Sequence, residues 1–293
     1  MSNILITGGA GFIGSPTAEV LAENNKVIIV DNLSTGCQEN IPHNAEFINC
    51  DIADEESIQK IMKNVDYVIH LASIVSIEES YNDPERFFRT NYIGFMNVIN
   101  SAVKNNVKKI VFSSSCSVYE EMPHEPKKES LCVYPTSPYA LSKINAEYLL
   151  EIYNKKYNLS YLALRYFNVF GPGQNLKSSY GTVIPTFIRK SLNNEDLVIL
   201  GDGNQQKDFI YIDDVVSANI LSINSKVTGK FNIGYGEGIR IIDLAKKIID
   251  LTCSESKIKY SDGRSGDVRY SVADISLSKA MLKWKINNNF DSA

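Results

Sequence analysis

The stretch TGGAGFIG, residues 7–14, follows a short apolar run at residues 4–6 and opens a segment with helical periodicity. Its glycines Gly8, Gly11 and Gly14 are spaced as GxxGxxG. Glycine at such positions permits a tight turn and lets backbone N–H groups approach a pyrophosphate, whose charge the N-terminus of the next helix stabilises. The stretch therefore predicts a strand, a loop and a helix that together hold a dinucleotide.

An acidic residue supports this interpretation. Asp31 ends the second apolar run, residues 27–30, and lies 23 residues after Gly8. A carboxylate at this place accepts a hydrogen bond from a ribose 2′-hydroxyl and repels a 2′-phosphate, so it favours NAD over NADP. The alternative is a structural turn followed by an Asp that caps a helix.

The rest of the first part of the chain alternates between short apolar runs and longer helical patterns. The β-branched runs are typical of strands that are covered on both faces. Their alternation with helices predicts an α/β fold, a Rossmann-type doubly wound parallel sheet. The expected strands lie at residues 4–6, 27–30, 47–48, 65–71, 110–112 and 161–164, and the expected helices at 16–24, 55–63, 84–105 and 138–156.

The amino-acid composition changes after Asn168, where Gly, Asn, Ser and Pro become frequent. We expect an NAD-binding domain at residues 1–170 and a smaller, mixed α/β substrate region at 171–293. The second region is expected to interleave with the first, with residues near 205–220 returning to it. A helix at 183–193 and a strand at 197–200 are predicted within it.

Composition excludes several classes of protein. The chain has 293 residues and a net charge of −4, with no block of like charges, so we expect no nucleic-acid partner. Its five cysteines are scattered without a CxxC pair, which favours reduced thiols over a metal site or a disulfide framework. No apolar run has the length of a membrane span. We therefore expect a cytoplasmic protein with no membrane partner.

The stretch SPYALSK, residues 137–143, places Tyr139 and Lys143 four residues apart, on one face of the predicted helix. Ser115, in the serine run that ends the strand at 110–112, lies 24 residues before Tyr139. A free phenol has a pKa near 10. A neighbouring ammonium favours the phenolate, which makes Tyr139 a candidate base and Ser115 a candidate hydrogen-bond donor. The alternative is a solvated helix face.

These motifs together resemble the short-chain dehydrogenase/reductases. The segments TGGAGFIGS and VDNLSTG are similar to the extended branch, which contains nucleotide-sugar epimerases and dehydratases, and CDI at 50–52 and HLAS at 70–73 resemble its cofactor-lining segments. The resemblance implies Ser115, Tyr139 and Lys143 as catalytic residues. It implies NAD bound by Gly8, Gly11, Phe12, Ile13, Gly14, Asp31, Asn32, Ser34, Thr35, Gly36, Asp51, Ile52, Leu71, Ala72, Ser73, Asn91, Ser113, Tyr139, Lys143 and Tyr166.

Two positions distinguish the reactions of this branch. The 4,6-dehydratases carry an Asp-Glu pair directly after the catalytic Ser or Thr, and decarboxylases keep the Glu; here these positions are Cys116 and Ser117. The chain instead resembles UDP-glucose 4-epimerases, which implies oxidation of a UDP-hexose to a transient 4-keto sugar and return of the hydride to its other face. The implied substrate-binding residues are Ser115, Ser117, Tyr139, Asn168, Val183, Leu200, Lys207, Arg264, Asp267 and Ser271.

Two of these residues bear on the substrate. Lys207 stands where the family usually has Arg, so one bidentate contact to the diphosphate is lost unless Arg269 replaces it. Ser271 is small where a large aromatic residue restricts the pocket of related epimerases, which predicts turnover of UDP-GlcNAc and UDP-GalNAc beside UDP-Glc and UDP-Gal.

Two other functions remain open at this point. One is net reduction of a 4-keto sugar by an oxidoreductase of the same branch. The other is a non-catalytic NAD sensor or scaffold, although such proteins tend to lose the Tyr or the Lys. The resemblance also implies a homodimer that pairs through the helices at 84–105 and 138–156.

Overall fold

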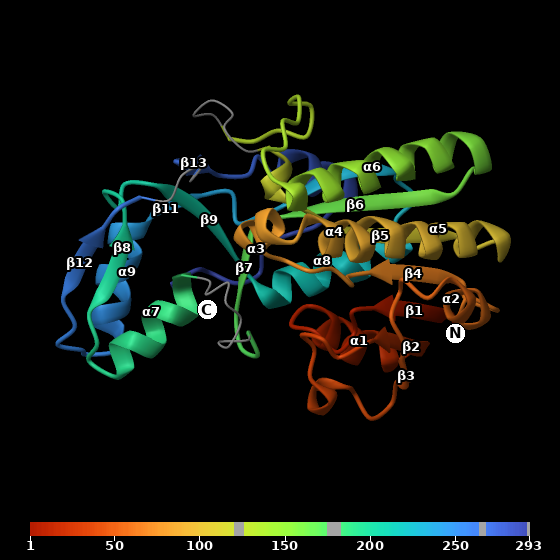
Figure 1. Ribbon diagram of the computed structural model, residues 1–293, viewed down its shortest axis with the longest axis horizontal. Helices are drawn as coiled ribbons and strands as arrows, with labels where there is room; N and C mark the ends of the chain where they lie inside the picture. The colour runs from red at the N-terminus through yellow and green to blue at the C-terminus, as the bar shows by residue number, and fades with distance from the viewer. Residues whose placement is uncertain (120–125, 175–182, 264–267, 292–293) are drawn as a thin grey trace.

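The computed structural model describes residues 1–119, 126–174, 183–263 and 268–291. Within them, parallel strands form a seven-stranded sheet in the order β10-β6-β5-β4-β1-β2-β3 (Figure 1). The chain moves outward from β1 in both directions, so the prediction of a doubly wound sheet is confirmed. The strands are β1 (Asn3–Thr7), β2 (Lys26–Asp31), β3 (Glu46–Asn49), β4 (Tyr67–His70), β5 (Lys109–Ser115), β6 (Ser160–Tyr166) and β10 (Gly229–Ile233).

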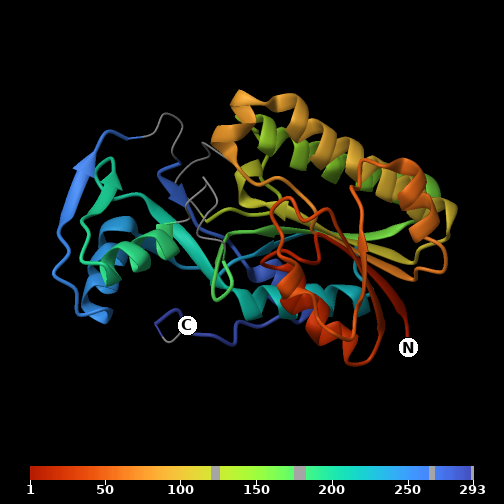
Figure 2. The same cartoon turned by 60° about the horizontal axis from the view of Figure 1, so that its bottom comes forward.

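Helices cover both faces of this sheet, and the central strands β1, β2 and β4 are accordingly rich in buried apolar residues. On one face lie α1 (Gly14–Ala22) and α8 (Ile212–Asn224), whose Ala18 and Val215 belong to one hydrophobic core. On the other face lie α2 (Glu55–Ile61), α5 (Phe95–Lys104) and α6 (Pro138–Tyr157), whose Phe95 and Leu150 belong to a second core (Figure 2).

The helix expected at 84–105 is divided into several elements. Asp83 caps α4 (Pro84–Phe88), and a π-helical segment, η2 (Arg89–Gly94), separates it from α5. Another short helix, α3 (Ile77–Asn82), precedes them. Periodicity alone does not reveal the π turn, which often marks a functional site.

The second part of the chain builds a smaller lobe. Its four-stranded sheet pairs β9 (Gln206–Tyr211) with β7 (Asn168–Phe170), β11 (Gly238–Arg240) and β13 (Tyr270–Ser271). Beside it, β8 (Leu197–Leu200) pairs with β12 (Ile258–Ser261), and α7 (Val183–Leu192) packs on α9 (Ile241–Leu251) around a third core. The remaining short helical elements of the described chain are η1 (Gln38–Asn40), η3 (Cys116–Val118) and η4 (Ser278–Leu282).

The chain crosses between the two parts more than once. Both α8 and β10 come after residue 170, yet α8 packs on α1 and β10 pairs with β6. The division into two domains near residue 170 stays a prediction, and these contacts support the expected interleaving. In the part of the chain that the structure describes, no helix has both the length and the apolar character needed to cross a membrane.

Candidate active site

A cavity of about 1800 Å³ runs along the carboxyl ends of β1, β2, β4 and β5 and continues to the smaller lobe. This is the edge at which open α/β sheets bind ligands. The cavity brings together every predicted site residue except four. Gly36 and Asn91 do not line it, and Arg264 and Asp267 lie outside the described residues.

The glycine loop can pack as tightly as it does only because its residues lack side chains. Gly8 has φ +72°, and a Cβ on it would lie 2.6 Å from the backbone nitrogen of Ala72. A Cβ on Gly14 would lie 2.1 Å from the carbonyl oxygen of Gly8. The loop therefore packs tightly against the loop after β4, and the start of α1 faces the cavity. This arrangement fits a pyrophosphate at the helix N-terminus.

The carboxylate of Asp31 is held at the end of β2. Its oxygens accept hydrogen bonds from the backbone N–H groups of Ala10, at 3.1 Å, and Leu33, at 2.8 Å. Asp31 lines the cavity beside the glycine loop, which fits a contact with a ribose hydroxyl.

The two predicted residues that do not line the cavity support its wall. The side-chain amide of Asn91 accepts a hydrogen bond from the N–H of Ile74 at 2.8 Å and donates one to the carbonyl of Ile74 at 3.0 Å. Gly36 packs against Ala10, which a Cβ would approach to 3.0 Å. Both residues act on the shape of the neighbouring loops.

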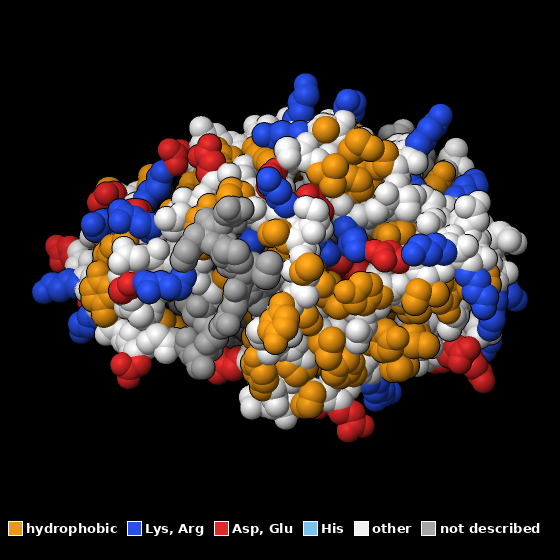
Figure 3. Space-filling model, turned by 90° about the horizontal axis from the view of Figure 1, so that it is seen from above, with side chains coloured by type: hydrophobic (Ala, Val, Ile, Leu, Met, Phe, Trp, Pro, Cys, Tyr) orange, Lys and Arg blue, Asp and Glu red, His pale blue; other side chains and the backbone are white. Residues whose placement is uncertain are grey.

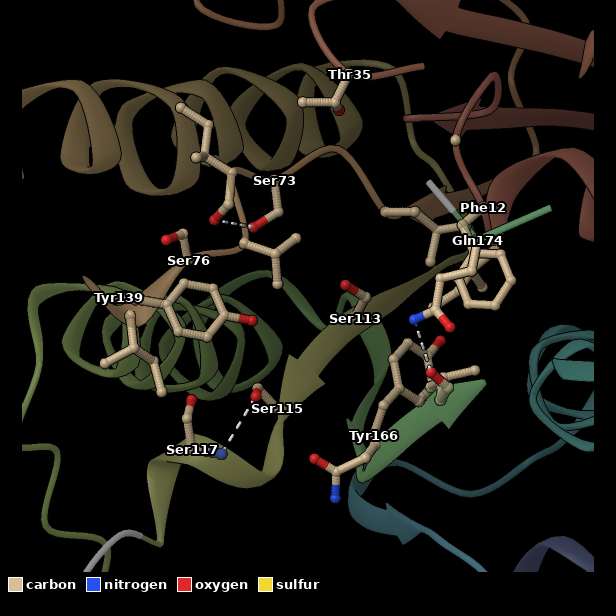
Figure 4. Close-up of a pocket in the computed structure, with 18 of the residues that line it drawn as sticks. Phe12, Thr35, Ser73, Ser76, Ser113, Ser115, Ser117, Tyr139, Tyr166 and Gln174 are labelled. Carbon is tan, nitrogen blue, oxygen red and sulfur yellow. Dashed lines mark hydrogen bonds between the residues drawn. The ribbon is translucent and has the colours of Figure 1, made fainter. Parts of the chain in front are cut away.

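The start of α6 fixes the tyrosine and the lysine. Ser137 caps the helix by accepting a hydrogen bond from Ala140, and Pro138 is its first residue. Lys143 is 3% exposed; its ammonium donates to the carbonyl of Ser113 at 2.8 Å and lies 5.8 Å from the ring centroid of Tyr139. Figure 4 shows the phenol of Tyr139 and the hydroxyl of Ser115 facing the same part of the cavity.

Burial sets the protonation of this region. It lowers the pKa of Lys143 to about 7, and the nearby Glu147 acts in the opposite direction. Burial, with a smaller contribution from Lys143, lowers the pKa of His70 to about 3, so this imidazole is neutral at physiological pH. The pKa of the Cys116 thiol is raised to about 11 by burial. The wall beside Ser115 therefore offers a neutral thiol and no strong acid or base from Cys116.

Ser117 presents an unusual hydroxyl. Its N–H donates to the Oγ of Ser115 at 3.2 Å, while its own buried Oγ has no hydrogen-bond partner among the described residues. Figure 4 shows this hydroxyl on the Tyr139 side of η3. A buried hydroxyl without a partner is unfavourable by about 1–3 kcal/mol. A polar ligand group in the cavity would remove that cost.

The opposite wall comes from the smaller lobe. Asn168 donates to the carbonyl of Asp208 at 2.6 Å, and the ammonium of Lys207 donates to the carbonyl of Val268 at 2.6 Å. Ser271 pairs in register with Lys207 between β13 and β9, and both line the cavity. Arg269 is exposed and pairs with Asp202 instead of lining the cavity.

Several cavity residues were not predicted from the sequence. They include Lys127, which is 1% exposed, and Gln174, which donates to the carbonyl of Val169 at 3.2 Å. Neither residue belongs to a sequence motif that predicts a binding site. Glu147 does not line the cavity, but it was also missed, although it follows Lys143 by four residues, the same spacing as between Tyr139 and Lys143. That spacing places Glu147 on the same helix face as Lys143, which could have indicated it as a neighbour of the site.

Comparison with known proteins agrees with this geometry. Residues 4–234 match the family described as NAD dependent epimerase/dehydratase. A Methanocaldococcus jannaschii protein provisionally named UDP-glucose 4-epimerase is 40% identical over 96% of this chain and 92% of its own length. A Bacillus cytotoxicus UDP-N-acetyl-alpha-D-glucosaminuronate decarboxylase is 36% identical over 87% of this chain and 81% of its own.

Solved structures are similarly close. A UDP-N-acetylglucosamine 4-epimerase from Methanobrevibacter ruminantium, in complex with UDP-N-acetylmuramic acid, is 42% identical, with a TM-score of 0.95 and coverage of 99% of this chain and 94% of that one. A UDP-glucose 4-epimerase from Thermotoga maritima, with UDP-glucose, is 38% identical, with a TM-score of 0.96 and coverage of 99% and 95%. The chain therefore belongs to the NAD dependent epimerase/dehydratase family, and is an NAD-dependent enzyme similar to the UDP-glucose 4-epimerases.

Proposed function

We propose that this enzyme interconverts UDP-hexoses at C4, acting on UDP-Glc and UDP-Gal and also on UDP-GlcNAc and UDP-GalNAc. The observation that carries the proposal is the convergence of Ser115, Tyr139 and Lys143 at one cavity, beside Cys116 and Ser117. The first three suit removal of a proton from a sugar hydroxyl. The last two are neutral groups with no carboxylate to drive elimination.

In this proposal Tyr139 is the base that takes the proton from the C4 hydroxyl and later returns it. NAD held by Asp31 and the glycine loop would supply the hydride acceptor and donor for C4, so the overall reaction would involve no net redox change. Lys143, fixed by the carbonyl of Ser113, stabilises the phenolate of Tyr139 by its positive charge. Ser115 donates a hydrogen bond to the reacting oxygen as charge develops on it.

The remaining predicted residues are proposed to bind the two ligands. Asp31 and the glycine loop hold NAD, whereas Asn168, Lys207 and Ser271 contact the nucleotide sugar from the smaller lobe. The small side chain of Ser271 lines the cavity and contacts the thiol of Cys116 by a hydrogen bond. A small residue there supports acceptance of an N-acetylated sugar. Val183 and Leu200 also line the cavity, from α7 and β8 of the smaller lobe.

Proton NMR of purified protein with UDP-Glc or UDP-GlcNAc, with and without added NAD⁺, tests the proposal. The anomeric signal of the C4 epimer should grow until both directions reach one equilibrium, without stoichiometric NADH. A 4-ketosugar reductase would instead consume NAD(P)H in proportion to product, and a decarboxylase would release CO2 from a uronate. A non-catalytic sensor would bind NAD⁺ and leave both sugars unchanged.

We further propose a cytoplasmic homodimer. Its five cysteines are all free thiols, as a reducing compartment favours. Figure 3 shows hydrophobic side chains gathered over the half of the molecule that carries α5 and α6. Ile93, Leu141, Tyr148 and Ile152, on η2 and α6, are between 39% and 56% exposed. A second copy of the chain would bury these residues.

Light scattering after size-exclusion chromatography tests the dimer. The protein should elute at twice its 32.7 kDa chain mass. The variant Tyr148→Asp/Ile152→Lys should elute as a monomer with an unchanged far-UV circular dichroism spectrum, and Val198→Lys, exposed on the smaller lobe, is the matched control. A monomeric wild-type protein at micromolar concentration would contradict this part of the proposal.

A further inference from the structure

A buried ion pair between α6 and β6 lies beside the candidate active site. Glu147 on α6 and Arg165 on β6 are 0% and 1% exposed. The guanidinium donates through Nε to one carboxylate oxygen at 2.9 Å and through Nη2 to the other at 2.6 Å. This is the bidentate geometry of a strong charge-assisted pair. Nothing in the proposed chemistry uses either residue.

The pair is bonded to the strand that carries the catalytic serine. Ser114 donates a hydrogen bond from its Oγ to the carboxylate of Glu147 at 2.5 Å. Its neighbours on β5 are Ser113, whose carbonyl accepts from Lys143, and Ser115. Because side chains alternate along a strand, Ser114 points to the opposite face from Ser113 and Ser115. The hydrogen bond from Ser114 therefore ties Glu147 to β5 at the position between Ser113 and Ser115.

Arg165 also begins a series of hydrogen bonds that leads toward the smaller lobe. Arg165 donates through Nη1 to the hydroxyl of Tyr119 at 2.9 Å, and this hydroxyl donates to Asn232 at 2.6 Å. The amide of Asn232 then donates to the carbonyls of Lys127, at 2.7 Å, and Asp274, at 3.1 Å. Lys127 lines the cavity, and Asp274 lies three residues after Ser271. A series of hydrogen bonds thus runs from β5, which carries Ser115, to the segment that carries Ser271.

We propose that Glu147 and Arg165 are positioning residues, which hold Ser115 and Lys143 in register across β5 and α6 and sustain the ammonium form of Lys143. This inference rests on the proposed function, because it assigns the two residues to the same proton transfer. A buried pair is weak evidence for stability as such, since its desolvation cost offsets its attraction. Its contacts with Ser114 and with the helix of Lys143 point to the placement of the catalytic groups.

The charge of Glu147 acts directly on Lys143. The titratable groups that face Lys143 in the described chain are Tyr139 and Glu147 on α6 and His70 on β4. Burial lowers the pKa of Lys143 to about 7, and Glu147 raises it. Removing this negative charge should therefore lower the pKa of Lys143 further and deprotonate it earlier as pH rises.

Three variants distinguish an effect on the position of the catalytic groups from an effect on the stability of the fold. Glu147→Gln removes the charge, and Ser114→Ala removes the bond between β5 and the carboxylate but leaves the charge in place. Glu151→Gln is the matched control: Glu151 is also on α6 and pairs with Lys230 of β10, but this pair is part-exposed and neither residue lines the cavity. Each variant is examined as the full chain for kcat against pH, thermal unfolding, and ¹³Cε NMR titration of lysine, in which the Lys143 signal is assigned from Lys143→Arg.

We expect Glu147→Gln to lower kcat by about 10- to 100-fold, with a smaller change in KM, as misplaced catalytic groups do. Its Lys143 midpoint, and the alkaline limb of kcat, should move down by about one pH unit. Ser114→Ala should lower kcat by about tenfold and leave the midpoint in place. Glu151→Gln should change none of these. If Glu147→Gln does not fold, Ser114→Ala alone carries the test of placement.

The inference is overturned if folded Glu147→Gln keeps kcat and the Lys143 midpoint within twofold and 0.2 pH units of wild type, on the order of experimental error. It is also overturned if Ser114→Ala keeps full kcat, or if Glu151→Gln loses as much as Glu147→Gln. Failure of the proposed function is a separate result: wild type would then epimerise neither sugar, while the NMR titration would still show whether Glu147 sustains the charge of Lys143.

Discussion

Replacing Lys143 by methionine should stabilise the NAD-free protein at acidic pH while abolishing catalysis. Lys143 is 3% exposed, and burial lowers its pKa from 10.5 to about 7. Below pH 7 both the folded and the unfolded chain carry the ammonium, so the folded state bears its full desolvation cost. A pKa difference of this size corresponds to about 5 kcal/mol. Methionine has a similar length and carries no charge.

The sign of the pH dependence follows from proton binding. Between pH 7 and 10.5 the unfolded chain binds a proton that the folded chain has released, so the wild-type free energy of unfolding rises with pH. Lys143→Met has no such dependence, but it loses the hydrogen bond to Ser113, worth about 1 kcal/mol. The variant should be more stable by about 3–4 kcal/mol at pH 6. This advantage should shrink steadily as pH rises.

Urea unfolding of the NAD-free protein at one protein concentration, at pH 6, 7.5 and 9, measures this difference. Lys155→Met, exposed on the same helix, is the control and should show no such trend. A Lys143→Met protein that is less stable than wild type at pH 6, or a difference that does not change with pH, would refute the reasoning.

Three further predictions concern the two ligands. Asp31→Asn should lower NAD⁺ affinity about tenfold and raise the affinity for NADP⁺, because the charge that repels a 2′-phosphate is gone; calorimetry that finds an unchanged preference would contradict the assigned role. Gly14→Ala should weaken NAD⁺ binding far more than Gly11→Ala, since the added Cβ would lie 2.1 Å from the Gly8 carbonyl oxygen in the first and 3.2 Å in the second; equal losses would argue against the loop geometry. Ser271→Tyr should lower kcat/KM for UDP-GlcNAc by at least about tenfold relative to UDP-Glc, and an unchanged ratio would remove Ser271 from the pocket wall that sets substrate size.

Much of the fold could be predicted because its signals are local. The apolar runs that end at Val30 and Phe112 lie in buried strands, and the spacing of Tyr139 and Lys143 does place them at the start of one helix. The division of the helix at 84–105 could not be predicted, since Asn91 of the π-helical segment bonds through its side chain to Ile74 in the loop after β4. That contact exists only once the two segments have packed.

The site was predictable to the extent that its residues lie in loops of recognisable composition. Glu147 and Arg165 were not identified, because each is a charged residue in a helix or strand whose burial depends on the other. Gly36 and Asn91 were predicted to bind the cofactor but do not line the cavity, and that role stays a prediction. Arg264 and Asp267 lie outside the described residues, and their roles stay predictions.

The fate of the C4 hydrogen tests the central claim most directly. Purified protein with NAD⁺ would be incubated in ordinary water with UDP-Glc, and separately UDP-GlcNAc, carrying deuterium at C4, and the C4 epimer analysed by mass spectrometry and NMR. The account predicts that the epimer retains the deuterium at C4, because one hydride leaves and returns within a single site. An epimer with protium at C4 would contradict hydride return, and the absence of any epimer from either sugar would contradict the proposed reaction.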